Sequence, residues 1–179
     1  TFFSGYEKIF KEKCEHYDIR FVPRTRESSI SEVAKVIYSF LNEVEYKYLL
    51  MVNACIPFLR IQTINHFLDN CKKNKTPAFA VFEKNNYFMS SENEPYNFSR
   101  EIKTINTKFV KPVREFAHVF YFFEREYFLK HHRYWDWNEV DYITIPHGIE
   151  CLDIDTEEDF NLAKLLWDNK TVRNDYQDW

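Results

Sequence analysis

Glycine is nearly absent from this sequence. Only 2 of the 179 residues are glycine, whereas average usage of about 7% would give about a dozen. A glycine-rich phosphate-binding loop is therefore excluded from these residues. No apolar run approaches the roughly 18 residues that a membrane span requires, and the four cysteines form no C-x-x-C pair or zinc-ligand spacing. We expect them to be reduced thiols, as in a cytoplasmic protein.

The sequence also lacks an excess of positive charge. Its formal net charge is −4, which gives no general attraction for nucleic acid. Apolar side chains, in contrast, are plentiful: 45% of the residues are hydrophobic and 19% are aromatic, enough for a sizeable core. We therefore expect one domain of ordinary size over residues 1–179.

The first half of the chain alternates amphipathic helices with short apolar strands. Residues 29–32, Ser-Ile-Ser-Glu, have the pattern of a capping box, which places a helix start there. The runs at 48–52 and 78–82 are continuously apolar, as in strands buried on both faces. The expected elements are helices at 3–17, 33–44 and 61–71 and strands at 19–22, 48–53 and 78–82. This order predicts a three-layer α/β fold with a mainly parallel sheet in which these strands lie side by side or nearly so.

The second half is less regular. Residues 84–115 are polar and predict loops with short antiparallel strands. The aromatic run at 118–124 predicts a strand. The remaining elements are a short helix at 126–131, a strand at 142–146 and a helix that Thr156 caps and that ends near Leu166.

Aromatic side chains are concentrated between Val113 and Tyr134. The rings in question are Phe116, Phe120, Tyr121, Phe122, Phe123, Tyr127 and Phe128. They offer more apolar surface than a one-sided strand and a short helix need, and exposed apolar patches mark interfaces. Residues 113–146 are therefore a candidate dimerisation insertion. Burial of the same rings in the chain's own core is the alternative.

The strongest chemical signal is the acidic segment Leu152-Asp153-Ile154-Asp155-Thr156. Side chains alternate along extended backbone, so Asp153 and Asp155 point to one side. Two adjacent carboxylates repel each other, and Mg²⁺, which favours one or two carboxylates together with substrate phosphates, would remove that repulsion. The alternative is that Asp155 and Asp159 only favour the start of a helix through its dipole.

Two further segments have the residue types of a ligand site. Arg24, followed by Ser28 and Ser29 at a predicted helix start, suits a nucleotide or another anion; the alternative is that Ser29 caps its helix and Arg24 is solvated. Asn53 follows the buried strand 48–52, at the edge where open α/β sheets bind ligands, and its amide can read a base or a sugar. An ordinary strand-to-helix turn is the alternative there. Cys55 has no evident base partner, so we do not expect a nucleophile.

Together these segments resemble the acylneuraminate (CMP-sialic acid) cytidylyltransferases. The run Leu152–Phe160 resembles the metal-binding motif of that family, Arg24 with Ser28–Ser31 its nucleotide-binding turn, and Asn53–Arg60 its strand-end segment. The stretch Ile105–Phe123 is similar to the middle of several members, and the resemblance extends over residues 15–168.

The resemblance implies a Rossmann-like nucleotidyltransferase fold and a reaction that joins CTP to a nonulosonic, sialic-type sugar acid with release of pyrophosphate. The implied site residues are Asp153 and Asp155 for Mg²⁺, Arg24, Ser28 and Ser29 for the nucleotide, and Asn53 for the sugar acid. A homodimer is also implied, in which the partner closes the sugar pocket. Such a reaction needs positioning and charge neutralisation more than a covalent nucleophile.

Two features of the family have no counterpart in the sequence, namely its N-terminal strand and its basic, glycine-containing loop for the triphosphate. We expect a cytidylyltransferase-like domain without them, and the activity of the chain alone is left open. Two alternatives remain. One is a related cytidylyltransferase for KDO, legionaminate or pseudaminate. The other is a non-catalytic binding or assembly domain with the same fold.

Overall fold

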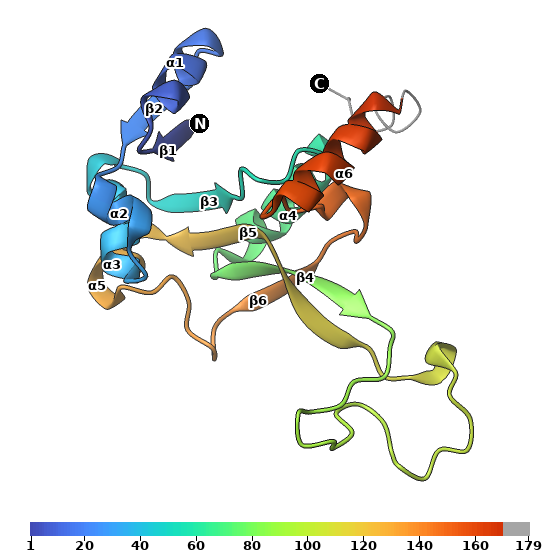
Figure 1. Cartoon of the computed structure of the whole chain (residues 1–179). Coiled ribbons are helices and arrows are strands. Elements are labelled where there is room, and N and C mark those ends of the chain that lie inside the picture. Colours follow the sequence, from blue (N-terminus) through green and yellow to red (C-terminus); the bar gives the residue numbers. More distant parts are fainter. Residues whose placement is uncertain (170–179) are drawn as a thin grey trace.

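A four-stranded sheet forms the centre of the computed structural model, which describes residues 1–169. The strands are β3 (Tyr48–Val52), β4 (Ala78–Lys84), β5 (Val113–Glu124) and β6 (Asp141–Thr144), in the order β3-β5-β4-β6 (Figure 1). β5 is antiparallel to both of its neighbours, while β4 and β6 are parallel. Consequently β3, β4 and β6 run in one direction and β5 runs against them. The predicted strands at 48–52 and 78–82 are confirmed.

A separate two-stranded sheet is formed near the N-terminus. β1 (Phe2–Gly5) pairs in parallel with β2 (Arg20–Pro23), and α1 (Lys8–His16) connects them. The prediction that strands 19–22, 48–53 and 78–82 share one sheet as near neighbours is therefore wrong. β2 belongs to the small sheet, and β5 lies between β3 and β4. Strand order depends on pairings between distant segments, which local periodicity does not encode.

The predicted helix at 3–17 begins later than expected. Phe3 lies in β1, and α1 starts at Lys8. The apolar spacing that suggested one continuous helix has another origin, because the ring of Phe3 on the strand packs on that of Phe10 on the helix at 5.2 Å between centroids.

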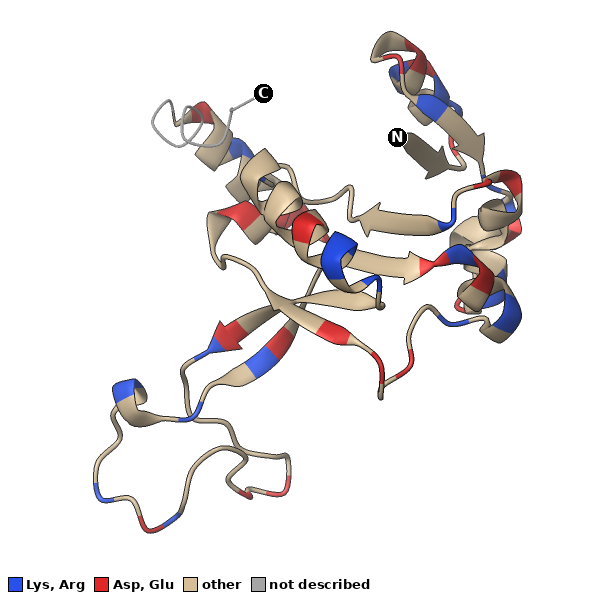
Figure 2. Ribbon diagram, turned by 180° about the vertical axis from the view of Figure 1, so that it is seen from behind, with Lys and Arg blue, Asp and Glu red and all other residues tan. Residues whose placement is uncertain are grey.

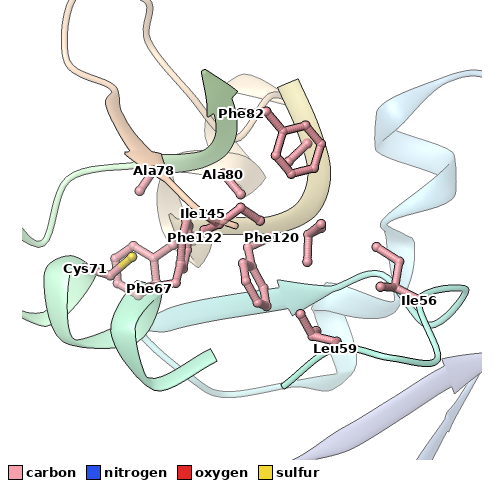
Figure 3. Packing of buried hydrophobic residues seen from close by; sticks show 12 residues of the cluster. Ile56, Leu59, Phe67, Cys71, Ala78, Ala80, Phe82, Phe120, Phe122 and Ile145 are labelled. Atoms are coloured by element: carbon pink, nitrogen blue, oxygen red, sulfur yellow. The ribbon is translucent and has the colours of Figure 1, made fainter. Parts of the chain in front are cut away.

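Helix α4 (Ile61–Asn74) covers one face of the main sheet. Alternate β4 residues, namely Ala78, Ala80 and Phe82, point to the same core as Phe67 and Cys71 of the helix (Figure 3). The alternation follows from the two-residue period of a strand. The long final helix, α6 (Glu157–Asp168), starts at Thr156 as predicted and lies near α4 in Figure 1.

The opposite face of the sheet is covered by short helices. Leu49 and Phe123 point to this side, away from their neighbours Leu50 and Phe122. They pack in a second buried cluster with Leu41, Val44 and Phe128. The covering elements are α2 (Arg26–Ile30), α3 (Ala34–Ile37), the 3₁₀ helix η1 (Ser39–Glu43) and α5 (Arg125–His131). Helices on both faces of a sheet give the predicted three-layer α/β architecture.

The aromatic segment contributes largely to the chain's own core. Of the seven rings singled out between Val113 and Tyr134, those of Phe120, Phe122, Phe123 and Phe128 are buried. The own-core alternative thus accounts for four of them, and a homodimer through residues 113–146 stays a prediction.

Residues 85–112 leave the sheet between β4 and β5 and project away from it (Figure 1). They contain an isolated antiparallel bridge between Met89 and Pro95 and the short 3₁₀ helix η2 (Thr107–Phe109). This matches the expected loops with little regular structure.

None of the helices within residues 1–169 has the length and apolar character needed to cross a membrane. Basic and acidic residues are interspersed along the ribbon in Figure 2.

Candidate functional site

Asn53 lies just beyond the carboxyl end of β3, and three hydrogen bonds hold it there. Its backbone N–H donates to the carbonyl of Val119 on β5 at 2.9 Å. Its side-chain oxygen accepts from the N–H of Cys55 at 2.9 Å, and its amide nitrogen donates to Asp153 Oδ2 at 3.0 Å. Because both ends of the amide are engaged, its orientation is fixed. The first and last bonds join Asn53 to segments far away in the sequence.

The acidic segment lies against the same turn. It follows β6 and the 3₁₀ helix η3 (Ile149–Cys151). The backbone N–H of Ile154, between the two aspartates, donates to the carbonyl of Cys55 at 3.0 Å. The sheet edge therefore brings Asn53 together with Asp153 and Asp155, although about a hundred residues separate them.

The carboxylate of Asp153 is poorly compensated. Its Oδ1 atom is buried and has no hydrogen-bond partner, while Oδ2 accepts from Asn53. Burial raises the pKa of Asp153, and the negative charge of Asp155 raises it further, against smaller opposing effects of Asn53 and His118. A buried polar atom without a partner costs free energy. A bound cation or donor would relieve that cost.

A cation at this edge would draw on few protein ligands. No cluster of three or more His, Cys, Asp or Glu side chains suited to a metal ion occurs within residues 1–169. Mg²⁺ commonly binds one or two carboxylates and completes its shell with water and substrate phosphates. The unpartnered oxygen of Asp153, with Asp155 beside it, fits that mode of binding and does not fit an all-protein cage.

His118 and Tyr121 belong to the same site, and sequence reasoning missed them. β4 advances from Phe79 to Val81 while its partner β5 passes from Tyr121 back to Phe116, so β5 carries extra, bulged residues. His118 has a left-handed backbone, with φ of 54°. Backbone strain of this kind concentrates at functional sites.

The bulge turns the ring of His118 toward Tyr121. Nδ1 of His118 and the hydroxyl of Tyr121 are 2.6 Å apart. Burial raises the pKa of Tyr121, as do Tyr38 and Asp153, and the tautomer of His118 sets which of the two atoms donates. Both side chains line a cavity of about 280 Å³ together with Met51, Val52 and Asn53.

Cys55 is not poised to react. Its side chain is exposed, yet desolvation raises the pKa of its thiol, and the charges of Asp153 and Asp155 raise it further. A thiol that stays protonated is a weak nucleophile. The geometry agrees with the sequence-based view that Cys55 does not attack a substrate.

The start of α6 explains one acidic residue of the motif. Thr156 Oγ1 accepts from the N–H of Asp159 at 3.2 Å, and Asp159 Oδ2 accepts from the N–H of Thr156 at 2.9 Å. The two residues thus form a capping box. The hydroxyl of Thr156 also donates to Asp159 Oδ2 at 2.7 Å, and this bond, followed by the one from the N–H of Thr156, lowers the pKa of Asp159. The helix-start alternative therefore applies to Asp159 and stays open for Asp155, while Asp153, which was not part of it, bonds to Asn53.

Arg24 and Ser28 lie elsewhere and bond to each other. The guanidinium of Arg24 donates to the hydroxyl of Ser28 through Nε at 3.1 Å and also to its carbonyl. Ser28 is fully buried, and its hydroxyl donates to the carbonyl of Ile37 at 2.9 Å. Figure 1 places α2 and α3 near the beginning of β3, the end opposite Asn53. A nucleotide-binding role for Arg24, Ser28 and Ser29 stays a prediction.

The predicted capping box at residues 29–32 is wrong. The N-cap of α2 is Thr25, whose hydroxyl accepts from the N–H of Ser28 at 3.0 Å. Ser29 lies within α2, and its hydroxyl donates back to the carbonyl of Arg26 at 2.8 Å. The helix expected at 33–44 is divided into α3 and η1.

Another cavity, of about 290 Å³, lies within residues 85–112. Two of its polar side chains are already paired. The hydroxyl of Tyr87 donates to the carbonyl of Asn106 and accepts from its N–H. The amide of Asn97 likewise donates to the carbonyls of Asn86 and Lys111. This cavity therefore reflects how the projecting segment holds its shape.

Comparison with known proteins identifies the fold of the chain. No protein-family profile and no curated protein sequence matches the chain. Among solved structures, 4-diphosphocytidyl-2C-methyl-D-erythritol synthase from Anaerococcus prevotii DSM 20548 is similar, with a TM-score of 0.60 and 14% identity over 90% of this chain and 76% of that one. CMP:2-keto-3-deoxy-manno-octonic acid synthetase complexed with CTP has a TM-score of 0.59 and 8% identity over 92% of this chain and 79% of that one. The chain therefore has the α/β fold of these nucleotidyltransferases.

Proposed function

We propose that this protein is a cytidylyltransferase that joins CTP to a nonulosonic, sialic-type sugar acid. One structural neighbour is a synthetase solved with CTP, and the other forms a diphosphocytidyl product by its name. The acidic motif at 152–160 and the turn at 53–60 carry the sequence resemblance. In the structure these two segments are bonded to each other at one sheet edge.

The observation that carries the proposal is the unpartnered, buried Oδ1 of Asp153. Asp155 adds a second negative charge beside it. Asp153 and Asp155 would hold Mg²⁺ at this edge, and the ion would neutralise phosphate charge that develops during transfer. Carboxylates that served only the helix start would be paired there, as Asp159 is.

The remaining side chains of the site suit an acceptor sugar. The cavity next to Asp153 presents the amide of Asn53 and the paired side chains of His118 and Tyr121. These groups donate and accept hydrogen bonds, as the hydroxyls of a sugar require. In the reaction the anomeric oxygen bonds to the α-phosphorus, the bond from that phosphorus to the β-phosphate oxygen breaks, pyrophosphate leaves and the hydroxyl proton passes to solvent.

The choice among sugar acids and the assembly state belong to the proposal. KDO, legionaminate and pseudaminate are alternative acceptors. One structural neighbour is named for the CMP-linked octonic acid, and this supports KDO as strongly as the sequence resemblance supports a sialic-type acid. A homodimer through residues 113–146 is retained as part of the proposal. The non-catalytic alternative predicts a protein that binds its ligand and releases no pyrophosphate.

The test is pyrophosphate release from CTP by the full-length protein with Mg²⁺ and a panel of nonulosonic acids and KDO. We expect release with one class of acid and with CTP over other nucleotides. Asp155→Ala should abolish release. Glu158→Ala, an acidic residue in the first turn of α6, is the matched control and should retain it. Binding of CTP without release, for every acid, would favour the binding-domain alternative.

A further inference from the structure

Glu150 is an acidic side chain buried at the base of the site. It is only 5% exposed and belongs to η3, directly before the acidic segment. Within residues 1–169, just three polar or charged residues are classed as buried, and the other two are Ser28 and Thr63. A carboxylate in such a position is costly unless hydrogen bonds compensate it.

The start of α4 provides that compensation. The N-cap residue of α4 is Arg60, whose side chain makes no capping hydrogen bond. Its backbone N–H donates instead to Oε1 of Glu150 at 3.2 Å, across 90 residues of sequence. The first N–H groups of a helix lack partners within the helix, and its positive dipole end favours a carboxylate. Glu150 thus acts as a remote cap for α4.

This cap joins the two segments that make up the proposed site. The turn at 53–60 runs from Asn53 to the start of α4, and the segment at 150–156 carries Asp153 and Asp155. Asn53 meets Asp153, the carbonyl of Cys55 meets the N–H of Ile154, and Glu150 meets Arg60. Of these three links, the one through Glu150 rests on the most deeply buried side chain.

From this geometry we infer that Glu150 is a positioning residue for the metal-binding aspartates. It anchors η3 to the start of α4 and so sets where Asp153 and Asp155 lie relative to Asn53. Groups that orient metal ligands from outside the coordination shell typically change metal affinity by about 10- to 100-fold. The inference rests on the proposed function, because it assigns Glu150 a role in holding Mg²⁺.

Two substitutions separate positioning from mere stability. Glu150→Ala removes the acceptor for the N–H of Arg60, whereas Glu150→Gln keeps an oxygen there. Asn74→Ala is the matched control, since it removes a hydrogen bond to Asp141 at the other end of α4. We expect Glu150→Ala to raise the Mg²⁺ concentration for half-maximal pyrophosphate release by about 10-fold, with most of the rate restored at saturating Mg²⁺. Glu150→Gln and Asn74→Ala should remain within about 3-fold of the wild type.

A Mg²⁺ requirement in Glu150→Ala that matches Asn74→Ala would overturn the inference. So would a uniform loss of rate at every Mg²⁺ concentration. If the wild-type protein transfers no nucleotide, the proposed function fails, and hydrogen exchange at the amide of Ile154 decides on Glu150 independently. Faster exchange in Glu150→Ala but not in Asn74→Ala supports the positioning role; equal exchange in both contradicts it.

Discussion

Two regions of this molecule contain buried polar atoms, and they differ in whether those atoms have hydrogen-bond partners. In the cluster around Ser28, the hydroxyl accepts from Arg24 and donates to the carbonyl of Ile37. At the sheet edge, Asp153 has one oxygen bonded to Asn53 and one buried oxygen without a partner. Both regions were candidate ligand sites on sequence grounds alone.

This is the difference that we expect between a structural network and the binding site proposed above. A buried polar group that makes all of its hydrogen bonds contributes to stability. A buried donor or acceptor without a partner lowers the stability of the fold by about 1–3 kcal/mol. In the Ser28 cluster, the hydroxyl of Ser28 already accepts one hydrogen bond and donates another. The Asp153 site retains an acceptor that a ligand would satisfy. The predictions below challenge this contrast from the largest expected effect to the smallest.

Replacing Asp153 by Asn should have the largest effect, and it should act on turnover. Asp153 would hold the cation that neutralises phosphate charge, and losing such stabilisation of the transition state costs on the order of 10²–10³-fold in rate, so we expect a loss near the upper end. Stability should not fall, because the substitution removes a desolvated charge. Pyrophosphate release and thermal unfolding measure the two quantities. Turnover within about 3-fold of the wild type would remove Asp153 from the site.

Ser28→Ala should show the reverse pattern. The carbonyl of Ile37 and the guanidinium of Arg24 each lose the fully buried hydroxyl of Ser28 as a partner. We expect a loss of about 1–3 kcal/mol in the free energy of unfolding, measured in urea. A purely structural role for Ser28, the alternative to the nucleotide-binding role implied by the resemblance, predicts an unchanged KM for CTP. A protein of normal stability with a raised KM for CTP would instead place Ser28 in the nucleotide site.

The raised pKa of Asp153 predicts a modest pH effect on the metal-free protein. Its carboxyl has a higher pKa in the folded chain than the ordinary value near 3.9 of an unfolded chain. As pH falls from neutrality through the folded pKa, the folded state takes up a proton that the unfolded state does not. Stability contributed by this group therefore rises as pH falls over that interval.

Asp153→Asn isolates this effect. The difference in unfolding free energy between the wild type and Asp153→Asn should favour the wild type increasingly as pH falls through the folded pKa, and should then level off. Comparing the two proteins cancels the opposite contribution of Asp159, whose pKa is lowered. A difference that does not vary with pH would mean that Asp153 is not desolvated.

The smallest effect is expected for Ser29→Ala. The hydroxyl of Ser29 is exposed and donates only to the carbonyl of Arg26 within α2. Unfolding free energy should change by no more than about 0.5 kcal/mol. Together with Ser28→Ala, this neighbouring substitution tests whether burial, and not residue type, decides the cost. Equal losses in both variants would refute the contrast.

Features with a local physical signal were predicted well. The strands at 48–52 and 78–82 were evident because each is a continuous apolar run. The start of α6 was evident because Thr156 is a favourable N-cap residue, and Asp159, three residues later, completes its capping box. Asn53 and Asp153 were both identified, since polar residues after a buried strand and paired acids are visible in sequence. Their mutual hydrogen bond was not, because it joins segments a hundred residues apart.

The failures arise where local signals compete or are silent. The residues at 29–32 satisfy a capping pattern, yet Thr25 provides the cap one turn earlier. Phe3 has helical spacing but pairs as a strand. His118 reaches the site through a bulge and a left-handed backbone. A histidine within an aromatic run predicts neither conformation.

The position of β5 between β3 and β4 also has a consequence for synthesis on the ribosome. Both neighbours of β5, namely β3 and β4, are made before β5 itself. At roughly 5–20 residues per second, the ribosome needs several seconds to proceed from the end of β3 to β5. During that time two apolar strands have no partner for their backbone groups, a state prone to aggregation. The nascent chain is therefore expected to depend on holding chaperones until Val113–Glu124 has emerged.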